Sequence, residues 1–164
     1  MPSISNKGKK MPASPIRRLV PYSDEAKRRG TKVYHLNIGQ PDIPTPDIVM
    51  DAIHKINLRV IEYSHSAGNE SYRRKLVTFY KNFGISVTHN DILITTGGSE
   101  AISFAIMAIA DPEDEIITIE PFYANYNGFA ATAGVRIIPV TSYIKDNFAL
   151  PPISEIEKRI TPRT

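Results

Sequence analysis

The segment from Ile94 to Ala101 has the residues best suited to bind an anion. It reads Ile94-Thr95-Thr96-Gly97-Gly98-Ser99-Glu100-Ala101. A β-branched run ends in two glycines, and a helix is expected to begin at a hydroxyl residue. Backbone N–H groups at a helix start have no partner within the helix, and the helix dipole favours an anion there. A phosphate would fit, with the Ser99 hydroxyl as a further donor. A plain tight turn is the alternative, since neither a Walker A loop nor the three-glycine dinucleotide fingerprint is present.

A second candidate is the aromatic segment Pro121-Phe122-Tyr123-Ala124-Asn125-Tyr126, directly after an expected strand. Ligands of α/β sheets bind at the carboxyl ends of strands, so we expect this loop to lie near the Gly-Gly-Ser turn. An aromatic side chain here could lie flat on a planar ligand ring. The same side chains could instead pack the strand–helix junction, and these residues taken by themselves leave both interpretations open.

Other polar residues carry less information. The loop Tyr63-Ser64-His65-Ser66-Ala67-Gly68 precedes a helix bearing Arg73 and Arg74, which by itself indicates no chemistry. The four histidines lack metal-ligand spacing, so we expect no metal site. The chain has no cysteine, which excludes disulfides, thiolate zinc sites and a cysteine nucleophile.

The first half of the chain is expected to be helical. We predict a helix over residues 14–29, stopped by Gly30, with Pro21 able to split it. Thr45 before Pro46 is typical of a capped helix start, and apolar residues then repeat on one face. Asn69 is expected to cap another helix that runs through Phe83. The residues of the apolar face are Ile48, Val49, Ala52, Ile53 and Ile56.

From Asp91 onward the pattern alternates between strand and helix. The expected strands cover residues 92–96, 115–119 and 135–140, and the expected helices cover residues 101–110, 123–133 and 153–159. The helix at 101–110 is almost wholly apolar, so we expect burial on most of its sides. This alternation predicts an α/β fold with a mainly parallel sheet.

Charge and hydropathy narrow the protein class. The 164 residues are 41% hydrophobic and 23% charged, which suits a soluble globular domain. Residues 1–34 hold nine Lys and Arg against two Asp and Glu, and the rest hold eleven against fifteen. We interpret the basic residues as a solvated arm and expect no nucleic-acid partner, because no groove-reading motif follows. No apolar run is long enough to span a bilayer and no secretory signal is present, so we expect no membrane association and a cytoplasmic protein.

Taken in order, five segments form a far more specific pattern. They are Asn37 to Asp42, Tyr63 to Gly68, Thr96 to Ala101, Asp111 to Glu115 and Pro121 to Tyr126. This series resembles the class I/II aminotransferases, the pyridoxal-phosphate enzymes of the aspartate aminotransferase superfamily, over roughly residues 14–164. Residues 1–13 lie outside the resemblance, and because they are polar and low in aromatic residues we expect a flexible basic tail there. The resemblance implies an N-terminal helix and substrate-loop segment at 14–45 and the first part of the aminotransferase-like large domain at 46–164.

The resemblance also implies roles for single residues. Gly98, Ser99 and Glu100 match the turn that holds the cofactor phosphate, and Tyr123 matches the aromatic residue that stacks on the pyridine ring. Tyr63 matches the tyrosine that reaches the cofactor phosphate of the partner subunit, which implies a homodimer with shared active sites. Gly39 matches the loop glycine whose backbone approaches the substrate carboxylate.

The implied reaction moves an amino group from an amino acid, with aspartate as the first expectation, to a 2-oxo acid such as 2-oxoglutarate. The family's cofactor-binding lysine and carboxylate-binding arginine match no residue here, so no residue is assigned as catalytic. We expect the chain to be the N-terminal part of a transaminase and inactive by itself. Two alternatives stay open. One is another pyridoxal-phosphate enzyme of this fold, either a lyase or the synthase that makes a cyclopropane amino acid. The other is a truncated domain that binds without catalysis.

Overall fold

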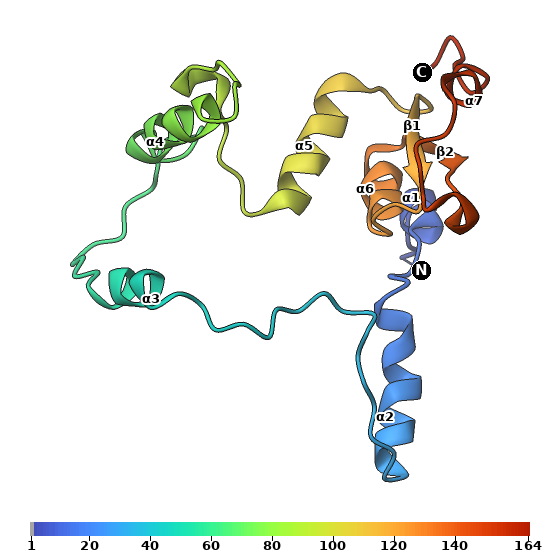
Figure 1. Cartoon of the computed structure of the whole chain (residues 1–164), viewed down its shortest axis with the longest axis horizontal. Coiled ribbons are helices and arrows are strands. Elements are labelled where there is room, and N and C mark those ends of the chain that lie inside the picture. The colour runs from blue at the N-terminus through green and yellow to red at the C-terminus, as the bar shows by residue number, and fades with distance from the viewer. Residues whose placement is uncertain (1) are drawn as a thin grey trace. The chain divides into compact units, whose positions relative to one another are not determined.

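The structure is a computed structural model that describes residues 2–164, apart from the side chain of Lys10. Met1, which belongs to the predicted tail at 1–13, lies outside the described residues. The chain divides into two units, whose helices and strands are labelled in Figure 1. The first comprises Met1–Tyr34 with Thr96–Thr164, and the second comprises His35–Thr95.

The first unit contains a parallel β-α-β arrangement. Strand β1 (Glu115–Glu120) pairs with β2 (Arg136–Thr141), with Ile116 opposite Ile137. Because parallel strands need a crossover connection, helix α6 (Tyr126–Ala133) joins them. This confirms the predicted α/β fold with parallel strands. The core combines Ile106, Ala130 and Val135, all buried, with partly buried apolar neighbours from both strands.

Helix α5 (Gly98–Ile109) packs against α6 and is less buried than its sequence predicts. Ile106 is buried, whereas Phe104, Met107 and Ile109 are 43%, 55% and 78% exposed. The expectation of burial on most sides is therefore wrong for the described residues. The physical reason is that α6 covers one face of α5 and leaves its other apolar face open.

The predicted strand at residues 92–96 is also wrong, because these residues are extended without a ladder partner. Within this segment the Ile94 N–H donates a hydrogen bond to the Ala67 carbonyl at 3.0 Å. A strand needs a row of such bonds to a neighbour. The β-branched run predicts extended backbone correctly, but it does not supply the neighbouring strand.

The N-terminal region forms more helix than predicted. Helix α1 (Asn6–Lys10) lies within the segment expected to be a tail, and the Gly8 N–H donates to the Ser5 hydroxyl that caps it. The helix predicted over 14–29 is split, as Pro21 allows. A 3₁₀ turn, η1 (Arg17–Leu19), precedes α2 (Val20–Arg28), and Pro21 lies in the first turn of α2. Proline suits that turn because its missing N–H would have no helical partner there.

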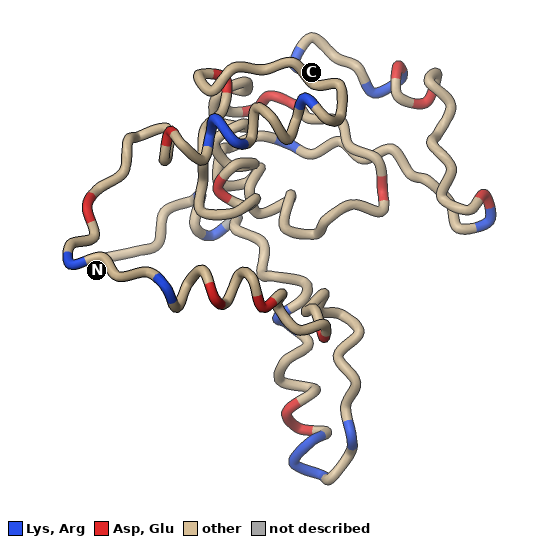
Figure 2. Tube along the Cα trace, turned by 60° about the vertical axis from the view of Figure 1, so that its left-hand side comes forward, with Lys and Arg blue, Asp and Glu red and all other residues tan. Residues whose placement is uncertain are grey.

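Basic residues outnumber acidic ones in this region, where Asp24 and Glu25 are the two acidic residues. Over the whole chain trace, Figure 2 shows Lys and Arg interspersed with Asp and Glu. At the end of α2 the Arg28 guanidinium pairs with the Glu25 carboxylate at 3.0 Å. This pairing reduces the local positive charge of the basic arm.

Among the described residues, no helix is both long and apolar enough to cross a membrane.

The second unit contains α3 (Asp47–His54), α4 (Glu70–Lys81) and the 3₁₀ turn η2 (His89–Asp91), of which α4 and η2 are in contact. Asn69 caps α4 as predicted, since its side-chain oxygen accepts the Tyr72 N–H at 3.1 Å. Thr45 does not cap α3, because Pro46 occupies the N-cap position. The Thr88 N–H and hydroxyl both donate to the Asp91 carboxylate at 2.7 Å, which lowers the pKa of Asp91.

The end of the first unit adds η3 (Ile144–Asp146) and α7 (Ile153–Glu157) after β2. Helix α7 ends two residues before the predicted Arg159. The Lys158 side chain donates to the Glu155 carboxylate near this end, which lowers the pKa of Glu155.

Gly68 offers a test of how the second unit packs. Its φ is +90°, and a Cβ atom there would lie 2.4 Å from the Ile94 Cβ. Gly84 also has a positive φ, +74°, but a Cβ there would meet no atom within 4 Å. A left-handed backbone costs a non-glycine residue roughly 1–2 kcal/mol, and overpacking adds about 1–3 kcal/mol.

We therefore expect Gly68→Ala to destabilise α4 by about 2–5 kcal/mol and Gly84→Ala by about 1–2 kcal/mol. Hydrogen exchange of the α4 amides, compared between each variant and the wild-type protein, measures the two losses of stability. Equal losses in the two variants would show that Gly68 is not packed against Ile94.

Candidate functional site

The turn before α5 has a backbone that only glycine adopts readily. Gly97 has φ +81° and ψ 174°, in a region that is essentially restricted to glycine. Gly98 then begins the helix, and a Cβ atom placed on it would meet nothing within 4 Å. The chain itself therefore leaves open space at the first helical residue.

The start of α5 also has backbone donors without a helical acceptor. The Ala101 N–H makes the first helical bond, to the Gly97 carbonyl at 3.4 Å. The amides of Gly98, Ser99 and Glu100 precede it, so the helical pattern gives them no carbonyl acceptor. No side chain caps this helix at its N-cap residue. Three consecutive amides and the exposed Ser99 hydroxyl thus form the donor set expected for an anion.

The Glu100 side chain stabilises the turn from within. Its carboxylate accepts the Thr96 N–H at 2.6 Å, and its side chain is half-buried. This bond spans Gly97 and Gly98 and fixes where the extended segment ends and the helix starts. The Thr96 N–H is thus a hydrogen-bond donor to the negatively charged Glu100 carboxylate. Of the atoms of Glu100, the backbone N–H is therefore the one suited to an anion.

The hydrogen bond between Thr96 and Glu100 was not expected from the sequence. The usual signature of such a bond is an acidic residue three positions after a capping hydroxyl residue. Here the spacing from Thr96 to Glu100 is four, because Gly97 takes the N-cap position. The sequence feature that could have indicated this bond is Glu100, an acidic residue at the third helical position.

Tyr123 lies in the loop between β1 and α6 and remains 48% exposed. Its ring meets the Tyr126 ring edge-on, with centroids 5.7 Å apart and an interplanar angle of 87°. The Asn125 side-chain amide donates to the Tyr123 hydroxyl at 2.6 Å, a contact that the sequence did not indicate. Phe122 stacks on Tyr126 at 6.1 Å. The aromatic residues therefore do pack together, while about half of Tyr123 stays available to a ligand.

Gly39 and Tyr63 belong to the second unit. A Cβ atom on Gly39 would meet nothing within 4 Å, and its φ is not in the left-handed region. Neither the backbone conformation of Gly39 nor the packing of the described residues requires glycine at this position. The Tyr63 side chain is fully exposed. The open space at Gly39 and the exposure of Tyr63 leave both residues accessible to a ligand or another protein chain.

The structure thus brings Gly98, Ser99 and Glu100 together on one turn. Tyr123 lies in a separate loop of the same unit. Gly39 and Tyr63 lie in the other unit.

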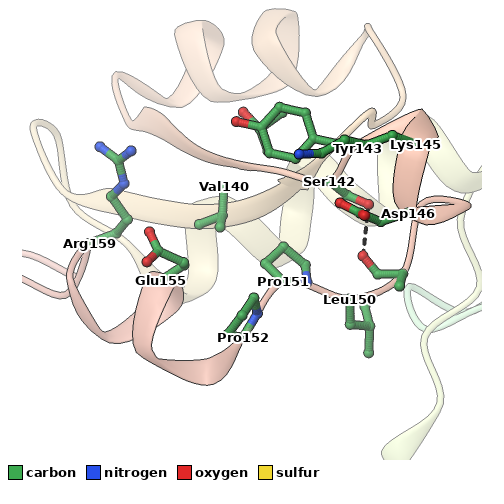
Figure 3. A pocket seen from close by; sticks show the side chains of 12 residues that line it. Val140, Ser142, Tyr143, Lys145, Asp146, Leu150, Pro151, Pro152, Glu155 and Arg159 are labelled. Carbon is green, nitrogen blue, oxygen red and sulfur yellow. Dashed lines mark hydrogen bonds between the residues drawn. The ribbon is translucent and has the colours of Figure 1, made fainter.

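A hollow of about 530 Å³ lies beyond the carboxyl end of β2 (Figure 3) and is lined by none of these residues. Lys145 and Arg159 face it together with Asp146 and Glu155, so its charges balance. The Ser142 hydroxyl at its wall donates to the Ala149 carbonyl at 2.9 Å. In residues 2–164 we find no group of three or more His, Asp or Glu side chains placed to hold a metal ion.

Comparison with known proteins gives this geometry its context. The sequence profile of the family described as aminotransferase class I and II matches residues 31–160. This match covers most of the chain and includes the turn, the Tyr123 loop, Tyr63 and Gly39. The chain belongs to the class I and II aminotransferases.

Two curated relatives illustrate the level of similarity to other members of this aminotransferase family. The aspartate/prephenate aminotransferase of Thermus thermophilus is 31% identical over 142 residues, covering 85% of this chain and 37% of the relative. The LL-diaminopimelate aminotransferase of Desulforudis audaxviator is 31% identical over 157 residues, covering 85% and 40%. The chain therefore spans about two fifths of the length of these relatives.

Solved structures agree on the fold. An alanine aminotransferase from Pyrococcus furiosus has a TM-score of 0.88 at 28% identity, covering 99% of this chain and 42% of that one. A double mutant of the Thermus thermophilus aspartate aminotransferase has a TM-score of 0.87 at 29% identity, covering 100% and 43%. These likenesses confirm the predicted aminotransferase-like fold.

The bond from Thr96 to Glu100 can be tested by substitution. Glu100→Ala removes the acceptor, and loss of a helix-end hydrogen bond costs about 0.5–2 kcal/mol. We expect faster hydrogen exchange of the Thr96 amide in this variant. Glu100→Gln keeps a side-chain oxygen acceptor and serves as the matched control with most of the protection retained. Equal exchange in the wild-type protein and Glu100→Ala would contradict the bond.

Proposed function

We propose that the protein is a pyridoxal-phosphate-dependent aminotransferase whose cofactor phosphate binds at the turn before α5. The observation that carries this proposal is the turn itself: Gly97 in a glycine-only conformation, open space at Gly98, and helix-start amides. Membership of the family supports the reaction class. Because the chain spans about two fifths of its relatives' length, the activity is proposed for the whole protein that carries these residues.

The residues of the turn fit a phosphate group. The amides of Gly98, Ser99 and Glu100 would donate to its oxygens, together with the Ser99 hydroxyl. The positive end of the α5 dipole favours the same charge. The Glu100 carboxylate already accepts the Thr96 N–H, so its negative charge is engaged by the turn. A side chain on Gly98 would occupy the space that the phosphate needs.

Three other residues would complete the contacts of this chain with the cofactor and the substrate. Tyr123 would stack on the cofactor ring and restrain its tilt, since half of its side chain is free for contact. Pyridoxal phosphate, when bound, supplies the electron-accepting ring and the carrier for the amino group. Gly39 would let the substrate carboxylate approach the backbone, and Tyr63 would reach the phosphate bound by a partner subunit.

We propose aspartate as amino donor and 2-oxoglutarate as acceptor. Support comes from the Asn37-to-Asp42 segment, which resembles the subgroup with prokaryotic aspartate aminotransferases, and from relatives named as aspartate or aspartate/prephenate aminotransferases. The role of Tyr63 implies a homodimer with shared sites. Its full exposure supports a contact outside its own subunit.

The phosphate assignment predicts the effect of one substitution. Ser99→Glu removes a hydroxyl donor and places a carboxylate beside the phosphate. A lost hydrogen bond to a charged group is worth about 1.5–3 kcal/mol, so we expect at least roughly tenfold weaker binding of pyridoxal phosphate. Equilibrium dialysis measures this affinity without reference to activity.

Ser154→Glu is the matched control, because Ser154 is the exposed second residue of α7 just as Ser99 is of α5. It adds the same charge at a helix start and should leave cofactor affinity unchanged. Unchanged affinity in Ser99→Glu would overturn the phosphate assignment.

An activity assay tests the reaction class. The whole protein that carries these residues, purified and supplied with pyridoxal phosphate, aspartate and 2-oxoglutarate, should form glutamate and oxaloacetate in equal amounts. Release of ammonia or loss of a substituent from the amino acid would instead indicate a lyase or a synthase of the same fold. Cofactor binding with no turnover of any amino acid would favour a binding domain.

A further inference from the structure

Arg73 is a buried cation that the proposed function does not use. Only 5% of its surface is exposed. Its Nη1 donates to the His89 carbonyl at 2.6 Å and its Nε donates to the Gly68 carbonyl at 3.3 Å. Burying a charge is costly unless it is hydrogen-bonded, and here two backbone carbonyls accept bonds from two nitrogens of the guanidinium. The guanidinium therefore bridges the segment before α4 to the segment after it.

The first of these segments carries Tyr63. Its end is fixed by further bonds, since the Gly68 N–H donates to the His65 carbonyl at 2.7 Å and the Ala67 N–H donates to His65 Nδ1 at 3.1 Å. Gly68 also lies directly against Ile94. The short stretch from Tyr63 to Gly68 is thus anchored at its carboxyl end by α4 through Arg73 and by the segment around Ile94.

The second segment leads into the phosphate turn. The Ile94 N–H donates to the Ala67 carbonyl at 3.0 Å, and the chain continues from Ile94 to Thr96 in two residues. Arg73 contacts the start of this segment at His89. A planar fork of donors can serve both carbonyls at once, which a lysine ammonium on a flexible stem cannot do in the same geometry.

We propose that Arg73 is a positioning residue that holds the Tyr63 loop in place for contact with the cofactor phosphate of a partner subunit. This inference rests on the proposed function. Arg73 touches neither cofactor nor substrate, and it acts by fixing the Gly68 carbonyl five residues after Tyr63. Loss of the bridge lets the loop move, and the Tyr63 hydroxyl then spends less time at the phosphate.

A double-mutant cycle on the cofactor-loaded protein tests the proposal. Tyr63→Phe removes the hydroxyl and should weaken pyridoxal-phosphate affinity roughly 10- to 100-fold, as for a lost hydrogen bond to a charged group. Arg73→Lys keeps the charge but not the two-carbonyl bridge, and should weaken affinity by roughly tenfold. If Arg73 acts through Tyr63, the double variant should bind about as weakly as Tyr63→Phe does.

Two controls separate positioning from general damage. Arg74→Lys changes the neighbouring residue, whose side chain is 59% exposed and pairs with Glu70, and it should leave affinity unchanged. Combining Arg73→Lys with Ser99→Ala should give additive losses, since Ser99 contacts a phosphate of its own subunit. A variant that merely unfolds would instead couple equally to Ser99 and Tyr63 substitutions.

Additive losses of Arg73→Lys and Tyr63→Phe, or no effect of Arg73→Lys, would overturn the positioning role. Failure of the proposed function has a different signature, in which Ser99→Glu leaves cofactor affinity unchanged. The Gly68 amide exchange rate gives a readout independent of cofactor, and it should rise in Arg73→Lys but not in Arg74→Lys.

Discussion

The hydrogen bond from the Thr96 amide to the Glu100 carboxylate determines where α5 begins, and the site depends on that position. It closes a turn whose second residue, Gly97, adopts a conformation that other residues avoid. The helix therefore starts at Gly98, and its first amides have no acceptor within the helix. If the helix began one residue later, Ser99 would move to the first helical position and the donor set would change.

Each unit carries a different part of the proposed binding residues. In the first unit these are the turn before α5 and the loop after β1, which we propose bind the cofactor of their own subunit. In the second unit Tyr63 is fully exposed and Gly39 has open space at its Cβ position. Arg73 fixes the loop end in this second unit by satisfying two carbonyls with one guanidinium. A buried cation serves this purpose because neither carbonyl is left without a donor.

Local chemistry made much of this fold predictable from the sequence. Asn69 as a cap, Gly30 as a helix stop and the alternation around β1 and β2 all depend on neighbouring residues, and these predictions are confirmed. The strand at 92–96 and the burial of α5 depend on which elements lie alongside, and those predictions are wrong. For the same reason the bond to Thr96, the Asn125 contact with Tyr123 and the carbonyl bridge of Arg73 were not found. Each requires knowing which atoms the fold brings together.

The central claim is that the amides of Gly98, Ser99 and Glu100 bind the cofactor phosphate. Amide chemical shifts of the protein, labelled with ¹⁵N at glycine, serine and glutamate, test it most directly in titrations with pyridoxal phosphate and with pyridoxal, which lacks the phosphate. Large shifts of these three amides with pyridoxal phosphate, and small shifts with pyridoxal, are the predicted result. If the three amides do not move when pyridoxal phosphate is bound, or move equally with pyridoxal, the phosphate binds elsewhere.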